Sequence, residues 1–337
     1  MTYFKILFLW LLLLLATILI ISPDIDWLAF LKSWDGGHFL GIAEHGYKYD
    51  FQLAFYPLFP ISIKLIWIIL PIPTQIIGFL LNLIFLIILL KYFKKLIELD
   101  FKEVVATRAI IALLLSPVSF FLLLPYSETL FLLLTVLSFY YIRKDRVFFG
   151  LLFASLSFVT RPLGLATILA VFYEIYLIRK SLNPKYLLTF MPFAVFLVFG
   201  WIQTHQKLFF IHTEEYWQRT LALPGQNIIE AVREVRHSNA IFRPLSELIA
   251  LFFGLLFTAL AFIKLRRSYF IYILLSLMLP LFTSKLTSLP RFLLVLFPIF
   301  ILLGLIKNRY YFFFIEVASV LGLIYFLNLF LQGAWVS

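Results

Sequence analysis

The chain has 337 residues, of which 63% are hydrophobic and 13% charged, and its formal net charge is +11. A water-soluble domain could not hide so much apolar surface, so this composition excludes a soluble globular protein and predicts an integral membrane protein. The absence of cysteine excludes disulfides, thiolate catalysis and cysteine-bound zinc.

Apolar runs predict an all-α polytopic protein with about eleven transmembrane helices, taking roughly 17–25 residues as one crossing and accepting shorter segments beside a cavity. The predicted spans are 5–22, 75–93, 104–123, 128–142, 147–160, 163–178, 186–205, 244–263, 269–284, 290–306 and 311–330. We expect the first to stay as an anchor, because no small-x-small cleavage motif stands before Pro23. Without an internal repeat or low-complexity linker, residues 1–337 are predicted to form a single transmembrane domain.

Orientation follows from lysine and arginine, which are enriched in the short cytoplasmic loops of membrane proteins. If the N-terminus is inside, the cytoplasmic span ends carry basic clusters that include Lys91, Lys94 and Lys95; Arg143, Lys144 and Arg146; and Lys264, Arg266 and Arg267. Since these clusters are dispersed between apolar segments, the positive charge indicates orientation and no nucleic-acid partner. Residues 23–74 and 206–243 then form two large extracytoplasmic loops.

Residues 57–70 are predicted to lie at the membrane surface, or to re-enter it, without crossing. The segment contains Pro57, Pro60 and Lys64, is shorter than the bilayer and ends before Pro71. A full crossing here would reverse the orientation of everything downstream.

Acids, imidazoles and glycines gather in the first extracytoplasmic loop, in contrast to the apolar segments around it. The loop contains Trp34-Asp35-Gly36-Gly37-His38-Phe39, Glu44-His45-Gly46-Tyr47 and Phe55-Tyr56-Pro57-Leu58-Phe59-Pro60. Membrane proteins hold ionisable groups where function uses them, so we interpret this loop as the reaction centre.

These motifs resemble the first luminal loop of the PIG-V family, the mannosyltransferases that add the second mannose of GPI anchors, and of its prokaryotic relatives. The resemblance continues at Ser116-Pro117-Val118-Ser119, Pro125-Tyr126-Ser127-Glu128, Thr160-Arg161-Pro162-Leu163-Gly164-Leu165 and Ser288-Leu289-Pro290-Arg291-Phe292. It implies a GT-C glycosyltransferase, a multi-span enzyme that transfers a sugar from a polyprenyl-phosphate donor on the non-cytoplasmic face with inversion at the anomeric carbon.

Inverting transfer needs a carboxylate that takes the proton of the acceptor hydroxyl as its oxygen attacks the sugar opposite the phosphate. Asp35 is the best candidate for this base, because it directly follows the first span. The alternative role for Asp35 is to cap a helix that begins at Gly36-Gly37.

Asp35, His38 and His45 could share one face of a helix. A neutral imidazole there could bind the acceptor or the departing phosphate, and the three residues together could hold a divalent metal, although this ligand set is short. Glu44 is either a second acid of the site or an ion-pair partner of Lys48. We therefore assign no metal and no certain cofactor.

The leaving phosphate needs positive charge, which Arg161 and Arg291 could supply by bidentate contacts. The alternative for each arginine is snorkelling to lipid headgroups. Glu128 could orient an acceptor hydroxyl, hold Arg161 or only stabilise a helix N-terminus, and the resemblance adds the neighbouring Tyr126 to the substrate-binding residues.

Two further features leave alternatives open. Aromatic residues of the first loop can anchor helices at headgroup depth or stack on a sugar ring; they are Trp34, Phe39, Tyr47, Tyr49 and Phe55. The polar loop 206–243 could be a lid over the acceptor or a surface cover.

The expected function is transfer of a sugar, with mannose favoured by analogy, to a lipid-linked glycan, glycolipid or protein. A transporter or lipid-linked sugar flippase is the alternative, but such proteins often have paired halves and charges near the bilayer midplane, and this chain shows neither pattern. Heavy use of Leu, Ile, Phe and Lys favours a prokaryotic plasma membrane over the endoplasmic reticulum.

Overall fold

The computed structural model describes residues 2–178, 183–237 and 242–336. Within these ranges the chain is helical, and its only extended pairing is one bridge between Leu221 and Thr283. The helices are α1 (Thr2–Ile21), α2 (Trp27–Leu31), α3 (Asp35–His45), η1 (Asp50–Ala54), α4 (Leu58–Ile69), α5 (Thr74–Ile97), α6 (Glu103–Leu114), η2 (Ser119–Leu122), α7 (Glu128–Arg143), α8 (Val147–Phe158), α9 (Gly164–Ile178), η3 (Pro184–Phe190), α10 (Met191–Thr204), α11 (Phe209–Glu215), α12 (Gln226–His237), α13 (Phe242–Lys264), α14 (Arg267–Leu281), α15 (Leu289–Leu294), α16 (Phe297–Gly304) and α17 (Arg309–Leu331).

The all-α polytopic class predicted from composition is confirmed. Five helical segments of the described chain are long and apolar enough to cross a bilayer; they are Tyr3–Ile21, Thr74–Ile97, Pro184–Thr204, Phe242–Lys264 and Arg309–Leu331. Shorter apolar helices stand at Leu58–Ile69, Val147–Phe158, Gly164–Ile178 and Arg267–Leu281. The number of crossings, about eleven from sequence, stays a prediction.

Two of the predicted spans are not continuous helices. The span expected at 104–123 ends as α6 at Leu114, and a turn at Ser116-Pro117 leads into η2. The span expected at 290–306 is divided into α15 and α16, with Pro298 in the first turn of the second. Proline lacks the N–H that continues a helix and its ring disfavours helical backbone before it, so both breaks have a local cause.

Helix α4 occupies the segment predicted not to cross. Its 12 residues would span about 18 Å, well short of the roughly 30 Å hydrocarbon core. Next to its start, the Leu58 N–H donates to the Val159 carbonyl at 3.1 Å, and just after its end Thr74 Oγ1 donates to Glu44 Oε1 at 2.5 Å. The first bond ties α4 to the α8–α9 turn, and the second ties the start of α5 to α3. That residues 57–70 lie at the surface or re-enter it without crossing stays a prediction.

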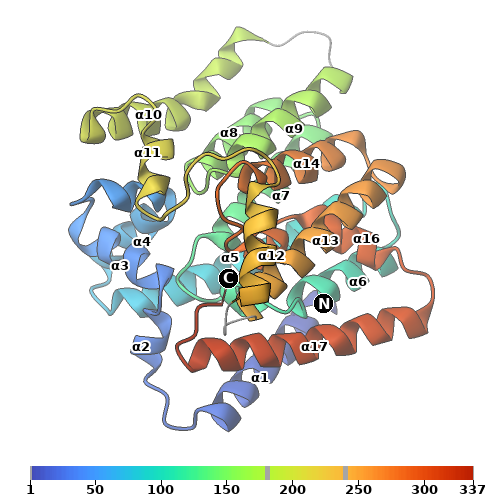
Figure 1. Ribbon diagram of the computed structural model, residues 1–337. Helices are drawn as coiled ribbons and strands as arrows, with labels where there is room; N and C mark the ends of the chain where they lie inside the picture. The colour runs from blue at the N-terminus through green and yellow to red at the C-terminus, as the bar shows by residue number, and fades with distance from the viewer. Residues whose placement is uncertain (1, 179–182, 238–241, 337) are drawn as a thin grey trace.

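Helix α7 is the centre of the bundle. All of its residues from Glu128 to Phe139 are buried, and it packs on α5, α8 and α9. In Figure 1, α2, α3, α4 and α11 gather at the left of the molecule, and α6 packs against α16 at the right. Helix α7 therefore links two parts of the protein that are built from different helices.

The end at which α7 terminates is closed by a network of ion pairs around the buried carboxylate of Glu174. Arg143 donates to both carboxylate oxygens of Asp100, at 2.7 and 2.8 Å, and Arg266 Nη2 donates to Glu174 Oε1 at 2.9 Å. Ser268 Oγ donates to the other Glu174 oxygen at 2.5 Å. The network joins the α5–α6 turn to α7, α9 and α14 at the end that the basic clusters predict to be cytoplasmic.

The orientation can be tested by single-cysteine labelling, because the natural chain contains no cysteine and every introduced thiol is unique. We expect His45→Cys, at a position where the histidine side chain is 60% exposed, to react with a membrane-impermeant maleimide in intact cells. Lys144→Cys, directly after α7, should react only after permeabilisation. The opposite pattern would reverse the assigned orientation, and labelling of both from one side would show that the two ends of α7 do not face opposite compartments.

Candidate active site

The site begins at a strained turn between α2 and α3. Asp26 caps the N-terminus of α2 by accepting the Leu28 and Ala29 N–H groups. The chain then turns at Trp34, whose φ of +51° is unusual for a residue with a side chain. Asp35 is the first residue of α3, and no side-chain capping bond forms at this terminus. The carboxylate points instead to a partner far along the chain.

Glycine at position 36 lets this turn pack closely on the Pro125-Tyr126 segment. A Cβ at Gly36 would lie 2.9 Å from the Leu31 carbonyl oxygen and 3.3 Å from Tyr126 Cε2. The Tyr126 hydroxyl donates to the Ser33 carbonyl at 2.9 Å, and Asn82 Nδ2 of α5 donates to the Tyr126 carbonyl at 2.9 Å. Tyr126 therefore holds the backbone next to Asp35, and α5 holds Tyr126.

Arg291 of α15 is the partner of Asp35. Its Nη1 donates to Asp35 Oδ2 at 2.8 Å, while its Nε and Nη2 donate to Glu128 Oε1 at 2.9 and 2.5 Å. The guanidinium also lies over the rings of Phe121 and Tyr126, 4.7 and 4.9 Å from their centroids. With Arg291 only 4% exposed and Glu128 fully buried, this cation is enclosed by two carboxylates and two aromatic faces.

Arg161 extends this chain of charges by one member. Its Nη1 lies 2.8 Å from Glu128 Oε1 and donates to Ser127 Oγ at 3.3 Å. The structure thus brings Asp35, Arg291, Glu128 and Arg161 together in one line of alternating charges, from four segments that are far apart in the sequence. Both arginines are engaged with carboxylates, which weakens the idea that either one chiefly binds a phosphate.

A cavity of about 290 Å³ lies beside this line. Asp35, Arg161 and Arg291 contribute to its wall, together with Phe39 and Phe55 of the first loop. The opposite wall comes from the 206–243 loop and from the α14–α15 connection; it includes Glu214, Trp217, Gln218, Arg219, Lys285, Thr287 and Ser288. Loop residues 238–241 lie outside the described residues. The polar side chains of two loops and one helix N-terminus therefore converge on one space.

His38 lies in an aromatic slot next to this cavity. Its ring is stacked on Phe55, with centroids 4.5 Å apart, and meets Trp217 edge-on at 5.3 Å. Burial lowers the pKa of His38 below its usual 6.5, and the nearby Asp35 carboxylate only partly opposes this effect. The imidazole is therefore neutral at pH 7.

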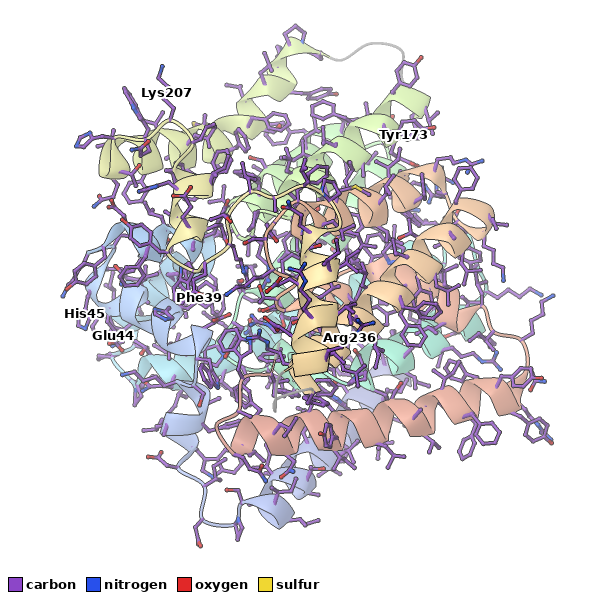
Figure 2. The ribbon with its side chains drawn as sticks, viewed as in Figure 1. Phe39, Glu44, His45, Tyr173, Lys207 and Arg236 are labelled. Atoms are coloured by element: carbon purple, nitrogen blue, oxygen red, sulfur yellow. The ribbon has the colours of Figure 1, made fainter. Side chains whose placement is uncertain are left out.

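Glu44 and His45 lie elsewhere. Glu44 accepts a hydrogen bond from Thr74 and stands 3.7 Å from the His45 imidazole, and Figure 2 shows both residues at the outer edge of the molecule, farther out than Phe39. The predicted alternative partner, Lys48, is replaced by Thr74 and His45. Neither Glu44 nor His45 contributes to the cavity wall.

The same geometry counts against the metal site considered from the sequence. Asp35 and His45 are ten residues apart on α3, which separates them by about 15 Å along the axis. Across the residues that the structure describes, no group of three or more His, Asp or Glu side chains could hold a metal ion. We therefore derive no chemistry through a metal.

A sequence model of the family described as Mannosyltransferase (PIG-V) matches residues 16–211, more than half of the chain. The chain belongs to the PIG-V mannosyltransferase family. This match confirms the family predicted from the separated motifs, and it includes the segments that carry Asp35, Glu128 and Arg161. Arg291, which completes the line of charges, lies beyond it.

Similarity to characterised members is local. GPI mannosyltransferase 2 of Drosophila melanogaster is 53% identical over 34 residues, covering 10% of this chain and 8% of that protein. GPI alpha-1,6-mannosyltransferase 2 of Rattus norvegicus and of Homo sapiens is 54% identical over 33 residues, covering 10% of this chain and 7% of each relative. The matches thus span less than a tenth of these relatives, and no solved structure matches the chain significantly.

Sequence reasoning missed several cavity residues of this PIG-V family member, among them Trp217, Arg219 and Lys285. The first two lie in the loop whose role was left open. Lys285 stands in Thr283-Ser284-Lys285-Leu286-Thr287, a polar interruption between apolar runs. That interruption was the available signal, because a lysine between two predicted spans can face a cavity as well as lipid headgroups.

His38 predicts a pH dependence of stability. Because its pKa is lower in the folded chain than the usual 6.5, the unfolded chain binds more protons just below that value. The contribution of His38 to the free energy of unfolding should be complete above about pH 6.5 and should decline as the pH falls below that value. The melting temperature of purified wild type should therefore decrease with acidification in this window, and less steeply for His38→Gln. His45→Gln, at the exposed outer edge, is the control and should follow wild type; a wild-type slope in His38→Gln would contradict the assignment.

Proposed function

We propose that this chain is an inverting mannosyltransferase that uses a polyprenyl-phosphate sugar as donor on the extracytoplasmic face, with Asp35 as the catalytic base. Family membership supports sugar transfer. The donor class rests on one observation, which is that the polar cavity at Asp35 adjoins an apolar cavity and shares part of its wall with it.

The apolar cavity has a volume of about 440 Å³ and lies between α9 and α14. Its interior is lined by side chains such as Leu165, Leu169, Leu275, Met278 and Leu279. The two cavities share Tyr56, Pro162, Glu214, Arg219, Lys285, Thr287 and Phe292. A ligand that fits both spaces has an apolar chain and a polar head, as a lipid-borne sugar phosphate does, whereas a nucleotide sugar would leave the apolar cavity unused.

Two cations stand at this junction. Arg219 Nε donates to Thr287 Oγ1 at 2.8 Å, and Lys285 Nζ donates to Gln218 Oε1 at 2.7 Å. Lys285 has no ion pair with a carboxylate in the part of the chain that the structure describes, so its charge is available to an anionic ligand. We therefore assign the phosphate chiefly to Lys285, with Arg219 beside it, although Arg219 Nη1 also lies 3.4 Å from Glu214 Oε2. Arg161 and Arg291 are assigned to holding Glu128 and Asp35.

The reaction then has a simple balance. The acceptor hydroxyl oxygen forms a bond to the anomeric carbon while the bond from that carbon to the phosphate oxygen breaks, and its electron pair leaves with the polyprenyl phosphate. Asp35 takes the hydroxyl proton, and Arg291 fixes the direction of its carboxylate. Lys285 and Arg219 stabilise the charge that grows on the phosphate.

The remaining assignments rest on analogy and charge distribution. Relatives named GPI mannosyltransferase 2 favour mannose as the sugar and a lipid-linked glycan as one acceptor class, besides glycolipids and proteins. Basic clusters near span ends support an extracytoplasmic site, and composition favours a prokaryotic plasma membrane. Trp217 then lines the acceptor side of the cavity, His38 packs against Trp217, and Tyr126 holds the backbone next to Asp35.

Asp35→Asn tests the base. The amide keeps the side chain's size but cannot take the proton, so transfer from polyprenyl-phosphate [³H]mannose in purified membranes should fall by about 10²–10⁴-fold. The control is Asp24→Asn, an exposed acid of the same loop, which should retain wild-type transfer. A variant Asp35→Asn that is folded and keeps its rate within threefold would remove Asp35 from the chemistry.

Lys285→Ala tests the phosphate site. Loss of a charge-assisted contact of about 1.5–3 kcal/mol should raise the KM for the lipid-phosphate donor by about tenfold to a hundredfold. Lys207→Ala removes an exposed lysine that contributes to neither cavity, and it should leave the KM unchanged. An unchanged KM in Lys285→Ala, or equal use of a nucleotide sugar by wild type, would contradict the proposed donor.

A further inference from the structure

Glu247 is a buried carboxylate of α13 that the line of charges described above does not include. Glu247 is only 1% exposed. Oε1 accepts the Ser288 N–H and Oε2 accepts the Leu289 N–H, each at 2.8 Å. Both oxygens of one side chain therefore bind consecutive backbone groups at the start of α15.

This start has no cap of its own. Ser288 has a φ of +64°, a left-handed conformation that is uncommon for serine, and its side chain makes no capping bond. Helix α15 has only six residues, so few internal hydrogen bonds fix its direction. Glu247 supplies the missing acceptors from a neighbouring long helix, and the Tyr272 hydroxyl holds the other end by donating to the Val295 carbonyl at 2.9 Å.

The direction of α15 decides where Arg291 points. Arg291 lies two residues after Leu289, in the same short helix, and reaches Asp35 at 2.8 Å. Thr287, which accepts from Arg219, and Ser288 itself contribute to the cavity wall just before this helix. A rotation of the α15 N-terminus would therefore displace Arg291, the partner of Asp35.

We propose that Glu247 is a positioning residue that sets the Asp35–Arg291 pair by fixing the N-terminus of α15. The proposal rests on the proposed function only where turnover is measured. This role requires a carboxylate. The side-chain amide of a glutamine at position 247 would direct its NH2 group at one of the two backbone N–H groups, so one of the two hydrogen bonds would be lost.

Turnover gives the first test. Glu247→Gln should lower kcat for sugar transfer by about tenfold to a hundredfold, because small misplacement of catalytic groups has effects of this size, and should change the donor KM less than threefold. Glu247→Asp keeps the charge and should retain more activity than Glu247→Gln. In an Arg291→Lys background the same Glu247→Gln change should have little further effect, because two residues that act through one contact are not additive.

The matched control is Glu174→Gln, which removes another buried carboxylate at the opposite end of the bundle. It should lower the melting temperature and leave kcat per folded enzyme unchanged. If Glu247→Gln also changed only the melting temperature, or if its effect on kcat added fully to that of Arg291→Lys, Glu247 would be a structural residue and the proposal would be overturned.

A second test needs no activity. The coupling between Asp35 and Arg291 is measured from the melting temperatures of Asp35→Asn, Arg291→Gln and the double variant, first with Glu247 and then with Glu247→Gln. We expect the non-additivity to fall by more than half in the second set, and an unchanged value would overturn the proposal. A wild type that transfers no sugar would reject the proposed function, while this cycle would still decide on Glu247.

Discussion

The enclosure of one guanidinium by two carboxylates is the constraint on which the site depends. A cation as deeply buried as Arg291 is tolerable only if opposite charge and hydrogen-bond acceptors surround it, since an unpaired buried charge costs several kcal/mol. Asp35 and Glu128 satisfy this requirement from the N-termini of α3 and α7. Because Arg291 and Glu128 are buried and meet Asp35 in the interior, the packing that closes this part of the fold also assembles the candidate site.

The consequence is that the two sides of the cavity are held in different ways. One side consists of helix N-termini bound to each other by charged and backbone contacts, with Tyr126 fixed between α5 and the turn at Ser33. The other side is the segment around Trp217 and Gln218, which is held by polar contacts to Phe51, Ser284 and Lys285, by packing of Trp217 on His38 and Phe55, and by the bridge between Leu221 and Thr283. In the proposed enzyme, the base is thus held in place by charged contacts before substrates bind.

The sequence predicted the helices well where an apolar run has clear ends. The runs at 75–93 and 311–330 correspond to α5 and α17 because bilayer-length apolar runs leave few alternatives. At Ser116-Pro117 and Pro298 the same hydropathy continues across a break, so composition alone extended the helices too far. The separation of Asp35 from His45 on α3 could have been worked out in advance from the rise of a helix, whereas the distance between Glu44 and the cavity could not.

What sequence could not supply is the pairing of distant charges. Asp35, Glu128, Arg161 and Arg291 were each identified as candidates, but nothing in their spacing indicates that Arg291 faces both acids and Arg161 only one. These contacts join residues separated by up to 256 positions, and only the packed structure determines them. Lys285 was overlooked for the same reason, since its position at the junction of two cavities depends on how α14 meets the 206–243 loop.

The helices of the bundle differ in length in a way that acts on the surrounding lipid. At about 1.5 Å per residue, α5, α13 and α17 extend for roughly 35 Å, whereas α9 and α14 extend for only about 22 Å. A bilayer next to short helices thins to avoid hydrophobic mismatch. Leu169 and Leu275 of those short helices line the apolar cavity, so hydrophobic mismatch with the bilayer would fall beside that cavity. In the proposed enzyme, thinning of the bilayer there would bring the headgroup of a lipid-borne donor closer to Lys285.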